Sequence, residues 1–522
     1  MRLSIKGQSL GYTPRPIGRP MHPGLSDRPR HPVLEDRPVS CSCKMSHILW
    51  EDRPLLKVVL NFAKSRNIKP YIVGGYLRDI LLKRQRPNPD IDFALKKDAI
   101  SFGRALAKDI KAGFVVLDRE HGACRLVKRM KGRAYTLDFT DFRGATLEED
   151  LLRRDFTINT LCLEPGSDSF IDLYNAAGDL KKKIIRLVNK DSFDEDPLRI
   201  LRAFSFSCIL GFKIEDDTLK RAVSKKSKLK GVSFERIRDE LFKILDSSRG
   251  YNCFRELDKS GILKVLFPEL EAMRGVTQGP YHHLDVWGHS LETFKNMEAI
   301  IRDKKNNREI QEYLDKVISA QRQRKSLVKL AALLHDIGKP RARRRKGKKL
   351  IFHGHERLGA EIAERIAKRL KLSNDELSAL KRIIFLHLRP GYLSDNEVLT
   401  PRAKFRFYRD AQDETISTLL VSLADQRATR GRLTTKTSRE RHEKLAASLI
   451  RQYFKEKNEK KPARLVNGDD LIREFKLKPS PLIGKILREI EELQAIGRVK
   501  TKKEALDAAR KFMNKNLVRE RP

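Results

Sequence analysis

The chain has 522 residues, and its 110 lysines and arginines against 69 aspartates and glutamates give a formal net charge of +41. This length allows three or four domains and excludes a small fold held together by disulfides. A cationic excess of this size favours a polyanionic partner, so nucleic acid is the expected ligand.

Cysteine spacing and hydropathy indicate a protein of the cytoplasm. The six cysteines lie at positions 41, 43, 124, 162, 208 and 253. Their spacing is neither that of metal ligands nor that of a disulfide framework. No apolar run reaches the roughly 18 residues of a membrane span, and no segment resembles a secretory signal. We therefore expect a cytoplasmic chain with no membrane partner.

Residues 1–47 are rich in Pro, Arg, Gly and Ser and show no hydrophobic periodicity. This composition predicts a disordered basic extension that contributes nothing to a core. The first amphipathic helix is expected over residues 48–65, and Met45 directly precedes it. Translation from Met45 is therefore an alternative to translation from Met1.

Residues 71–95 read as strand, glycine turn, helix, loop and second strand. The helix expected over 76–83 begins at the pair Gly74-Gly75. Free backbone N–H groups and the positive end of the helix dipole attract anions there, and glycines admit a bulky one, so a triphosphate is the expected ligand.

The second strand of this unit carries two aspartates. Asp90 and Asp92 are two residues apart, so their side chains lie on the same face of a strand. Paired carboxylates beside a phosphate site are suitable ligands for the Mg²⁺ ions of an in-line phosphoryl transfer.

The chain then continues with a helix expected at 98–110, a strand at 114–118, a charged loop at 121–131 and a strand at 133–142 that contains Asp138. A helix-like segment from 147 to 163 and two short strands within 166–190 complete the first folded unit, which we expect to span 48–190.

Two motifs in this unit resemble a known family. They are Gly74-Gly75-x-x-Arg78-Asp79 followed by Asp90-x-Asp92, and the run RRDFTIN at 153–159. Both are similar to the head of the class II CCA-adding tRNA nucleotidyltransferases and bacterial poly(A) polymerases. The resemblance implies an α+β fold in which a head with a small mixed sheet precedes helical domains.

The resemblance also implies roles for individual side chains. Asp138 would be a third catalytic carboxylate beside Asp90 and Asp92, the alternative being an ordinary strand residue. The implied nucleotide-binding residues of the head are Gly74, Gly75, Arg78, Asp79, Arg153, Arg154, Asp155 and Asn159. Asparagine and aspartate can bond ribose hydroxyls, and arginine can hold phosphate bidentately.

Residues 194–202, DEDPLRILR, are predicted to open a helix with acids in its first turn and proline at its start. Asp196 and Arg199 are three apart and are expected on one helical face. The run resembles the family's EDxxRxxR motif. The resemblance implies that Asp196 and Arg199 form a protein template that pairs with C or A, and that Arg202 also binds nucleotide. A plain salt bridge at a helix start is the alternative.

From 219 to 267 the pattern is helical, and SFERIRDEL at 233–241 resembles the neck of the same family. We expect 191–275 to form a helical neck and RNA-binding body.

A spaced series of histidines and aspartates follows within 276–460: His289, His335-Asp336, His355, His387 and Asp425. Their order resembles the HD-domain metal-dependent phosphohydrolases. The resemblance implies an all-α domain in which His289, His335, Asp336 and Asp425 bind metal, with His355 and His387 as further metal or phosphate contacts. Imidazole with carboxylate suits a transition metal such as Mn²⁺, Co²⁺ or Ni²⁺.

Two further segments complete the chain. The basic run at 341–349 is expected to be a solvated loop that adds to RNA attraction. Residues 461–522 are expected to form a helical C-terminal segment, with two helices within 464–509.

The predicted function is template-independent addition of CMP and AMP, from CTP and ATP, to the 3′ end of tRNA, with a separate hydrolytic site. Three alternatives stay open: a poly(A) polymerase, an enzyme that adds only CC or only A, and an inactive RNA-binding head that serves an HD phosphohydrolase. The intact Asp90/Asp92 pair argues against the last.

Overall fold

The computed structural model describes residues 52–84, 87–164, 170–303, 308–347, 349–396, 398–459 and 463–517. The basic extension at 1–47 and the beginning of the helix expected from residue 48 lie outside these residues. Within the described ranges, no helix is both long enough and apolar enough to span a bilayer.

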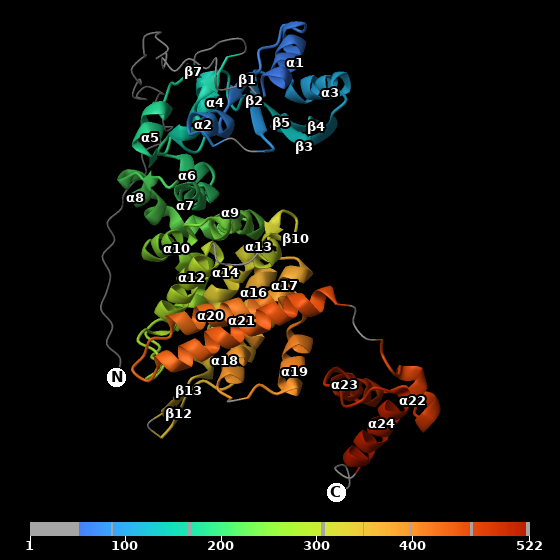
Figure 1. The fold of residues 1–522 in the computed structure, drawn as a ribbon. Helices are drawn as coiled ribbons and strands as arrows, with labels where there is room; N and C mark the ends of the chain where they lie inside the picture. Colours follow the sequence, from blue (N-terminus) through green and yellow to red (C-terminus); the bar gives the residue numbers. More distant parts are fainter. Residues whose placement is uncertain are drawn as a thin grey trace, which may run out of the picture. The chain divides into compact units, whose positions relative to one another are not determined.

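A seven-stranded mixed sheet forms the head (Figure 1). The strands are β1 (Tyr71–Val73), β2 (Asp90–Leu95), β3 (Gly113–Asp118), β4 (Ala123–Met130), β5 (Arg133–Asp141), β6 (Cys162–Leu163) and β7 (Phe170–Ile171). Their order is β3-β4-β5-β2-β1-β6-β7. Only the central pair β2 and β5 is parallel among these strands, so the predicted mixed sheet is confirmed.

Strand β4 corrects the expectation of a charged loop at 121–131. Cys124 and Leu126 are fully buried, whereas Arg125, Val127 and Arg129 alternate with them on the more open face. β4 pairs with both β3 and β5. Val127 on the outward side and Lys128 on the inward side interrupt the apolar–polar alternation that marks a strand.

The alternation of β2 directs its aspartates away from the main core. Phe93 belongs to the core cluster and stacks on Phe139 of β5 at a ring distance of 4.7 Å. Ala94 belongs instead to a second cluster, with Leu151 of α4 (Leu147–Leu152). Asp92 therefore lies on the sheet face that α4 covers.

The other helices of the head are α1 (Arg53–Lys64), α2 (Gly75–Leu81), α3 (Ala99–Asp109), the 3₁₀ turn η2 (Thr157–Asn159) and α5 (Ala176–Lys182).

The next segment is helical except for one short strand pair. It contains β8 (Ile184–Ile185), α6 (Ser192–Glu195), α7 (Leu198–Leu210), β9 (Lys213–Ile214), α8 (Asp216–Lys225), η3 (Lys226–Gly231), α9 (Phe234–Asp246), α10 (Gly250–Lys259), α11 (Ile262–Leu266) and η4 (Pro268–Met273). β8 and β9 pair in parallel. The helix expected to open at residue 194 is two helices, because Asp196 is extended between α6 and α7.

Residues 276–460 are mainly helical. Their elements are α12 (Val286–Arg302), α13 (Arg308–Asp315), β10 (Val317–Ser319), β11 (Arg322–Gln323), α14 (Arg324–Leu334), α15 (Lys339–Ala342), β12 (Arg344–Lys346), β13 (Lys349–Ile351), α16 (His355–Arg369), α17 (Asn374–Leu386), α18 (Arg389–Ser394), α19 (Pro401–Ala411), η5 (Gln412–Glu414), α20 (Thr415–Ala428) and α21 (Lys436–Asn458). The all-α expectation needs correction, since β10–β11 and β12–β13 form two small hairpins. The second hairpin is the basic run that was expected to be a loop.

The C-terminal segment has its own small core. It contains α22 (Gly468–Phe475), α23 (Pro481–Ala495) and α24 (Lys502–Leu517), one helix more than the two expected within 464–509. Leu471, Ile486 and Ala505, one from each helix, are buried together.

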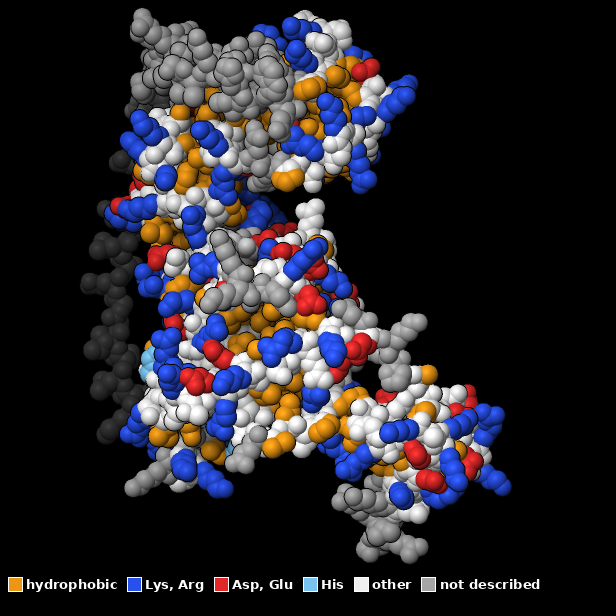
Figure 2. All heavy atoms as spheres, viewed as in Figure 1, with side chains coloured by type: hydrophobic (Ala, Val, Ile, Leu, Met, Phe, Trp, Pro, Cys, Tyr) orange, Lys and Arg blue, Asp and Glu red, His pale blue; other side chains and the backbone are white. Residues whose placement is uncertain are grey.

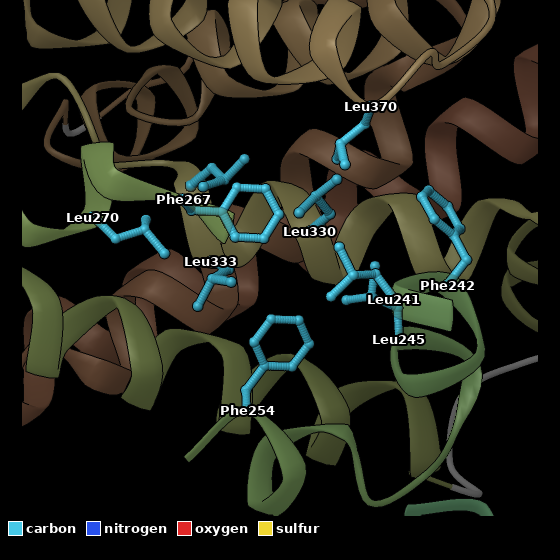
Figure 3. A pocket seen from close by; sticks show the side chains of 10 residues that line it. Leu241, Phe242, Leu245, Phe254, Phe267, Leu270, Leu330, Leu333 and Leu370 are labelled. Carbon is cyan, nitrogen blue, oxygen red and sulfur yellow. The ribbon is translucent and has the colours of Figure 1, made fainter. Parts of the chain in front are cut away.

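Helices from 234–266 and from 324–369 share a core (Figure 3). A small cavity there is lined by Leu241, Phe242, Leu245, Phe254, Phe267, Leu270, Leu330, Leu333, Leu334 and Leu370. Its volume is about 10 Å³ and its lining side chains are all apolar. It offers neither the room nor the polar partners that a ligand needs, so it reflects packing.

Candidate active sites

An open cleft of about 350 Å³ joins the head to the neck. It is lined by Asp92, Asp138, Thr140, Arg143, Asp150, Arg154, Asp155, Asp196, Arg199, Arg202 and Arg236. The predicted residues Asp92, Asp138, Arg154, Asp155, Asp196, Arg199 and Arg202 are thus brought together. Four lining residues were missed: Thr140, Arg143, Asp150 and Arg236.

Two carboxylates stand side by side at the head end of the cleft. Asp92 of β2 and Asp138 of β5 are register partners on parallel strands, so both side chains lie on one face. Burial raises the pKa of Asp92 to about 6; Arg154 opposes the shift, while Asp138 and Asp90 add to it. This concentration of negative charge in oxygen ligands fits a divalent cation such as Mg²⁺.

Asp138 is held by an arginine that the sequence analysis placed in a loop. Arg125 of β4 donates from Nε to Oδ1 of Asp138 at 2.8 Å and from Nη2 to Oδ2 at 2.7 Å. Asp138 can bind a cation through these oxygens only if Arg125 moves or shares them.

Gly74 occupies a position where a side chain does not fit. Its φ is +81°, and an added Cβ would lie 3.0 Å from Nη1 of Arg154 and 3.3 Å from Oδ2 of Asp92. Gly75, the first residue of α2, has no such strain, and its added Cβ would only touch the guanidinium of Arg78 at 3.4 Å. The two glycines of the motif therefore have different roles.

The residues predicted from GGxxRD and RRDFTIN bond mainly to one another. Nη1 of Arg78 donates to Oδ1 of Asn159 at 2.7 Å, and its Nε and Nη2 donate to Oδ1 of Asp79. Nδ2 of Asn159 donates to Oδ1 of Asp155 at 2.9 Å. Nε and Nη2 of Arg202 donate to Oδ2 of the same carboxylate. These contacts connect α2, η2 and α7, and nucleotide contact by these residues stays a prediction.

Asp196 and Arg199 approach the cleft from separate local structures. Asp196 lies before α7 and its Oδ2 is 2.7 Å from Nη2 of Arg236. Arg199 is buried and donates to Oγ of Ser192 at 2.7 Å and to the carbonyl oxygen of Arg153 at 2.7 Å. The expectation that they are neighbours on one helical face is corrected: in the described residues each has a different ionic partner, Arg236 for Asp196 and Glu195 for Arg199.

Arg153 is exposed, and it contributes to this corner of the cleft through its backbone carbonyl. Arg236 comes from the segment expected to form the neck, where its spacing on α9 resembles that of any surface arginine. No local signal marked it.

A second polar centre lies among the helices of 276–460. It gathers all six predicted residues: His289 of α12, His335 and Asp336 at the end of α14, His355 of α16, His387 at the end of α17 and Asp425 of α20. We call these residues the His/Asp cluster.

The carboxylates lie between the imidazoles. Nε2 of His289 is 2.9 Å from Oδ1 of Asp425, and Nε2 of His335 is 3.1 Å from Oδ2 of Asp336. The other oxygen of Asp336 is 3.3 Å from Nε2 of His355 and 3.7 Å from Nε2 of His387. Asp336 is therefore central to the cluster.

Three of the four imidazoles of the cluster are oriented by a backbone carbonyl, as in a metal site. Nδ1 of His335, His355 and His387 lies 2.9, 2.8 and 2.6 Å from a backbone carbonyl three residues earlier, to which it can donate. In the neutral ring, this leaves each Nε2 as a lone-pair nitrogen facing the cluster. Those Nε2 atoms are buried with no hydrogen-bond partner among the described residues, and the Asp336 oxygens between them make ion-pair contacts only. Buried imidazole nitrogens that lack a hydrogen-bond partner and lie beside a carboxylate are suitable ligands for a divalent cation.

Lys339 joins this centre and was missed from the sequence. It is buried, and its Nζ is 2.6 Å from Oδ2 of Asp336 and 2.6 Å from Oε1 of Gln278. Burial opposes the charge on Asp336, but His335 and Lys339 hold the pKa of its carboxyl well below the usual range.

Three protein families match successive parts of the chain. Residues 70–186 match the "Poly A polymerase head domain", residues 211–274 the "Probable RNA and SrmB- binding site of polymerase A" and residues 286–430 the "HD domain". The class that the fold and both centres define is therefore a polymerase-type nucleotidyltransferase head followed by RNA-binding and HD domains.

Similar proteins extend this likeness over most of the chain. The A-adding tRNA nucleotidyltransferase of Deinococcus radiodurans is 31% identical over 445 residues, which cover 83% of this chain and 93% of that protein. The CC-adding tRNA nucleotidyltransferase of Thermus thermophilus is 30% identical, over 83% and 91% of the two chains. A solved CCA-adding enzyme in complex with ATP has the same fold, with a TM-score of 0.61 at 22% identity, over 90% of this chain and 99% of that one. The chain belongs to the class II CCA-adding tRNA nucleotidyltransferase and poly(A) polymerase family, as a tRNA nucleotidyltransferase with an HD domain.

Proposed function

We propose that the chain adds CMP and AMP, from CTP and ATP, to the 3′ end of tRNA and so completes or repairs CCA. The observation that carries the proposal is the cleft in which Asp92 and Asp138 of the head face Asp196 and Arg199 of the neck. It combines carboxylates for phosphoryl transfer with hydrogen-bonding groups for choosing a base.

In the proposed reaction, the terminal 3′-hydroxyl of tRNA attacks the α-phosphorus of the nucleotide. A new O–P bond forms, the hydroxyl loses its proton and pyrophosphate leaves. Asp90 and Asp92 would hold Mg²⁺, with Asp138 as a further ligand, and the metal supplies electrostatic stabilisation of the attacking and leaving oxygens. Arg154 lies beside Asp92 and Gly74, where its guanidinium would bind triphosphate oxygens.

Base selection is assigned to Asp196 and Arg199. A carboxylate accepts and a guanidinium donates, so together they can match the polar edges of cytosine and adenine. Their fixed positions support this role, because Ser192 and the carbonyl of Arg153 orient Arg199 while Arg236 orients Asp196. Polar groups left unpaired by a wrong base would penalise UTP and GTP.

The decisive experiment uses three tRNA substrates, ending before, within and after CCA, with CTP and ATP supplied separately and together. We expect CC from CTP alone, CCA from both nucleotides and no extension of complete tRNA. Addition of only CC or only A would identify a partial enzyme, and long A tails on generic RNA would identify a poly(A) polymerase. No transfer at all would support the RNA-binding alternative.

The His/Asp cluster supports a second activity, hydrolysis of phosphomonoesters or cyclic phosphates at RNA ends. The supporting observation is that Nε2 of His335, His355 and His387 is buried beside Asp336 with no hydrogen-bond partner among the described residues. A transition metal such as Mn²⁺, Co²⁺ or Ni²⁺ would be held there and would supply activation of water near neutral pH. Release of phosphate from these esters, measured with each metal in turn, tests the proposal. If none of these metals supports hydrolysis, the cluster has a structural role instead.

A further inference from the structure

The segment from Asp336 to His355 leaves the His/Asp cluster and returns to it. It contains α15, β12 and β13, and its two ends are both cluster residues. An added Cβ on Gly338 would lie 2.1 Å from the carbonyl oxygen of His355, so the two ends pack backbone against backbone. The β12–β13 hairpin is thus anchored beside the cluster at both ends.

The hairpin presents several cations on one face. Cross-strand partners are Arg344 with Ile351, Arg345 with Leu350 and Lys346 with Lys349. Since partners share a face and neighbours alternate, Arg344, Lys346 and Lys349 lie on the same side. The three-residue ladder extends by roughly 10 Å, and Figure 1 shows the hairpin projecting from the helices.

The exposed cations of this segment lack carboxylate partners among the described residues. Six cations are exposed: Arg341, Arg343, Arg344, Arg345, Lys346 and Lys349. Figure 2 shows basic side chains at the lower left, where Figure 1 places the hairpin. In the part of the chain that the structure describes, no ion pair involves any of these six side chains, whereas many other surface cations are paired, such as Arg308 with Glu312. A run of like charges without partners is self-repelling and suits a polyanion.

We propose that the β12–β13 hairpin binds the phosphate backbone of an RNA whose 3′ end lies in the His/Asp cluster. The substrate of that centre is then an RNA chain end and not a free nucleotide. The inference rests on the hydrolytic function proposed above. For a 2′,3′-cyclic phosphate, water forms a new O–P bond, one ring P–O bond breaks, and the released hydroxyl oxygen takes a proton, which leaves a phosphomonoester.

The test uses the full chain loaded with Mn²⁺ and compares its hydrolysis of two substrates: a tRNA that ends in a 2′,3′-cyclic phosphate, and 2′,3′-cyclic AMP. The variant combines Arg344→Ala, Lys346→Ala and Lys349→Ala. Its KM for the tRNA should rise about tenfold or more, and the salt dependence of log KM should flatten by about two units, because three phosphate contacts are lost. Its kcat/KM for cyclic AMP should stay within about twofold, because cyclic AMP has no preceding phosphates for the hairpin to bind.

A charge-matched control combines Arg441→Ala, Lys444→Ala and Lys455→Ala, which removes three exposed cations from α21. It should leave KM for the tRNA unchanged. An equal rise in KM in this control would reduce the effect to net charge and overturn the inference. The inference would also be overturned if the hairpin variant lost as much activity on cyclic AMP, or in nucleotide addition to tRNA, as it loses on the tRNA with the cyclic phosphate.

Failure of the underlying function gives a different result. If the unaltered chain hydrolyses neither substrate with any of the metals, the hydrolase proposal falls and the inference falls with it. Hydrolysis of both substrates with no hairpin effect overturns the inference alone.

Discussion

The carboxylate of Asp155 accepts two hydrogen bonds from Arg202, at 3.0 Å from Nε and 2.7 Å from Nη2. Asp155 is buried in the head motif and Arg202 is on α7 of the neck. Glu240 of α9 also contacts Arg202, at 3.4 Å. One guanidinium therefore connects the head to two neck helices at the base of the cleft.

Replacement of Arg202 should destabilise this junction. Arg202→Ala leaves the Asp155 carboxylate buried without its partner, which costs about 3 kcal/mol. Calorimetry should show a lower Tm at neutral pH. Arg221→Ala, which breaks an exposed pair with Asp217 on α8, is the control and should leave Tm unchanged. An equal Tm for Arg202→Ala and Arg221→Ala would refute the structural role of Arg202.

The same pair predicts a pH dependence. Burial opposes ionisation of Asp155, but Arg202 and Asn159 lower the pKa of its carboxyl in the folded state. Stability from this group is therefore present above its unfolded pKa of about 4 and is lost as the pH falls through the lower, folded value. The Tm difference between the parent and Arg202→Ala should narrow below about pH 4. A constant difference across the acid range would contradict this assignment.

The two motif glycines should respond differently to alanine. Gly74→Ala forces a side chain into a conformation that costs about 1–3 kcal/mol and pushes against Arg154 and Asp92. We expect a large loss of kcat for nucleotide addition. Gly75→Ala is the matched control and should retain most activity, since residue 75 is helical and its Cβ meets only ordinary contact distances. Similar activities in the two variants would disprove the strain argument.

The carboxylates of β2 should be needed for transfer and not for tRNA binding. Asp90→Ala and Asp92→Ala should each abolish incorporation of labelled CMP and AMP because a ligand for Mg²⁺ is removed. tRNA affinity, measured by filter binding, should change little. Substantial residual transfer in either variant would exclude a metal-binding role for the altered residue.

Arg199 should determine base choice through the planar geometry of its guanidinium group. Arg199→Lys keeps the charge but cannot make the same set of hydrogen bonds to Ser192, Arg153 and a base. We expect the ratio of kcat/KM for CTP over UTP to fall about tenfold or more, as for loss of a hydrogen bond to a charged group. Equal losses for all four nucleotides would indicate that Arg199 only supports the fold.

Changes at the His/Asp cluster should separate the two activities. The double variant His335→Ala, Asp336→Ala should lose phosphoester hydrolysis and bound transition metal, measured by elemental analysis, and keep CCA addition. His353→Ala is the control, because His353 is exposed and outside the cluster. Retention of metal and hydrolysis by the double variant would place the centre elsewhere.

The sequence by itself determined which residues are the candidates for the chemistry, because those signals are local. A two-residue spacing puts Asp90 and Asp92 on one strand face, and an apolar helix that ends at His335-Asp336 delivers both side chains to one point. Propensity and periodicity act over a few residues, so they were sufficient for most helices and the ligand types, whereas the mixed sheet of the head was expected from the family resemblance.

Only the tertiary structure decided what each of these side chains touches. Arg125 reaches Asp138 from the neighbouring strand, and Arg236 reaches Asp196 from 40 residues away. A hydrogen bond depends on positions within a few tenths of an ångström, and neither composition nor period specifies such positions between distant segments. For the same reason β4 was missed: its strand conformation comes from pairing with β3 and β5, which its own charged sequence does not predict.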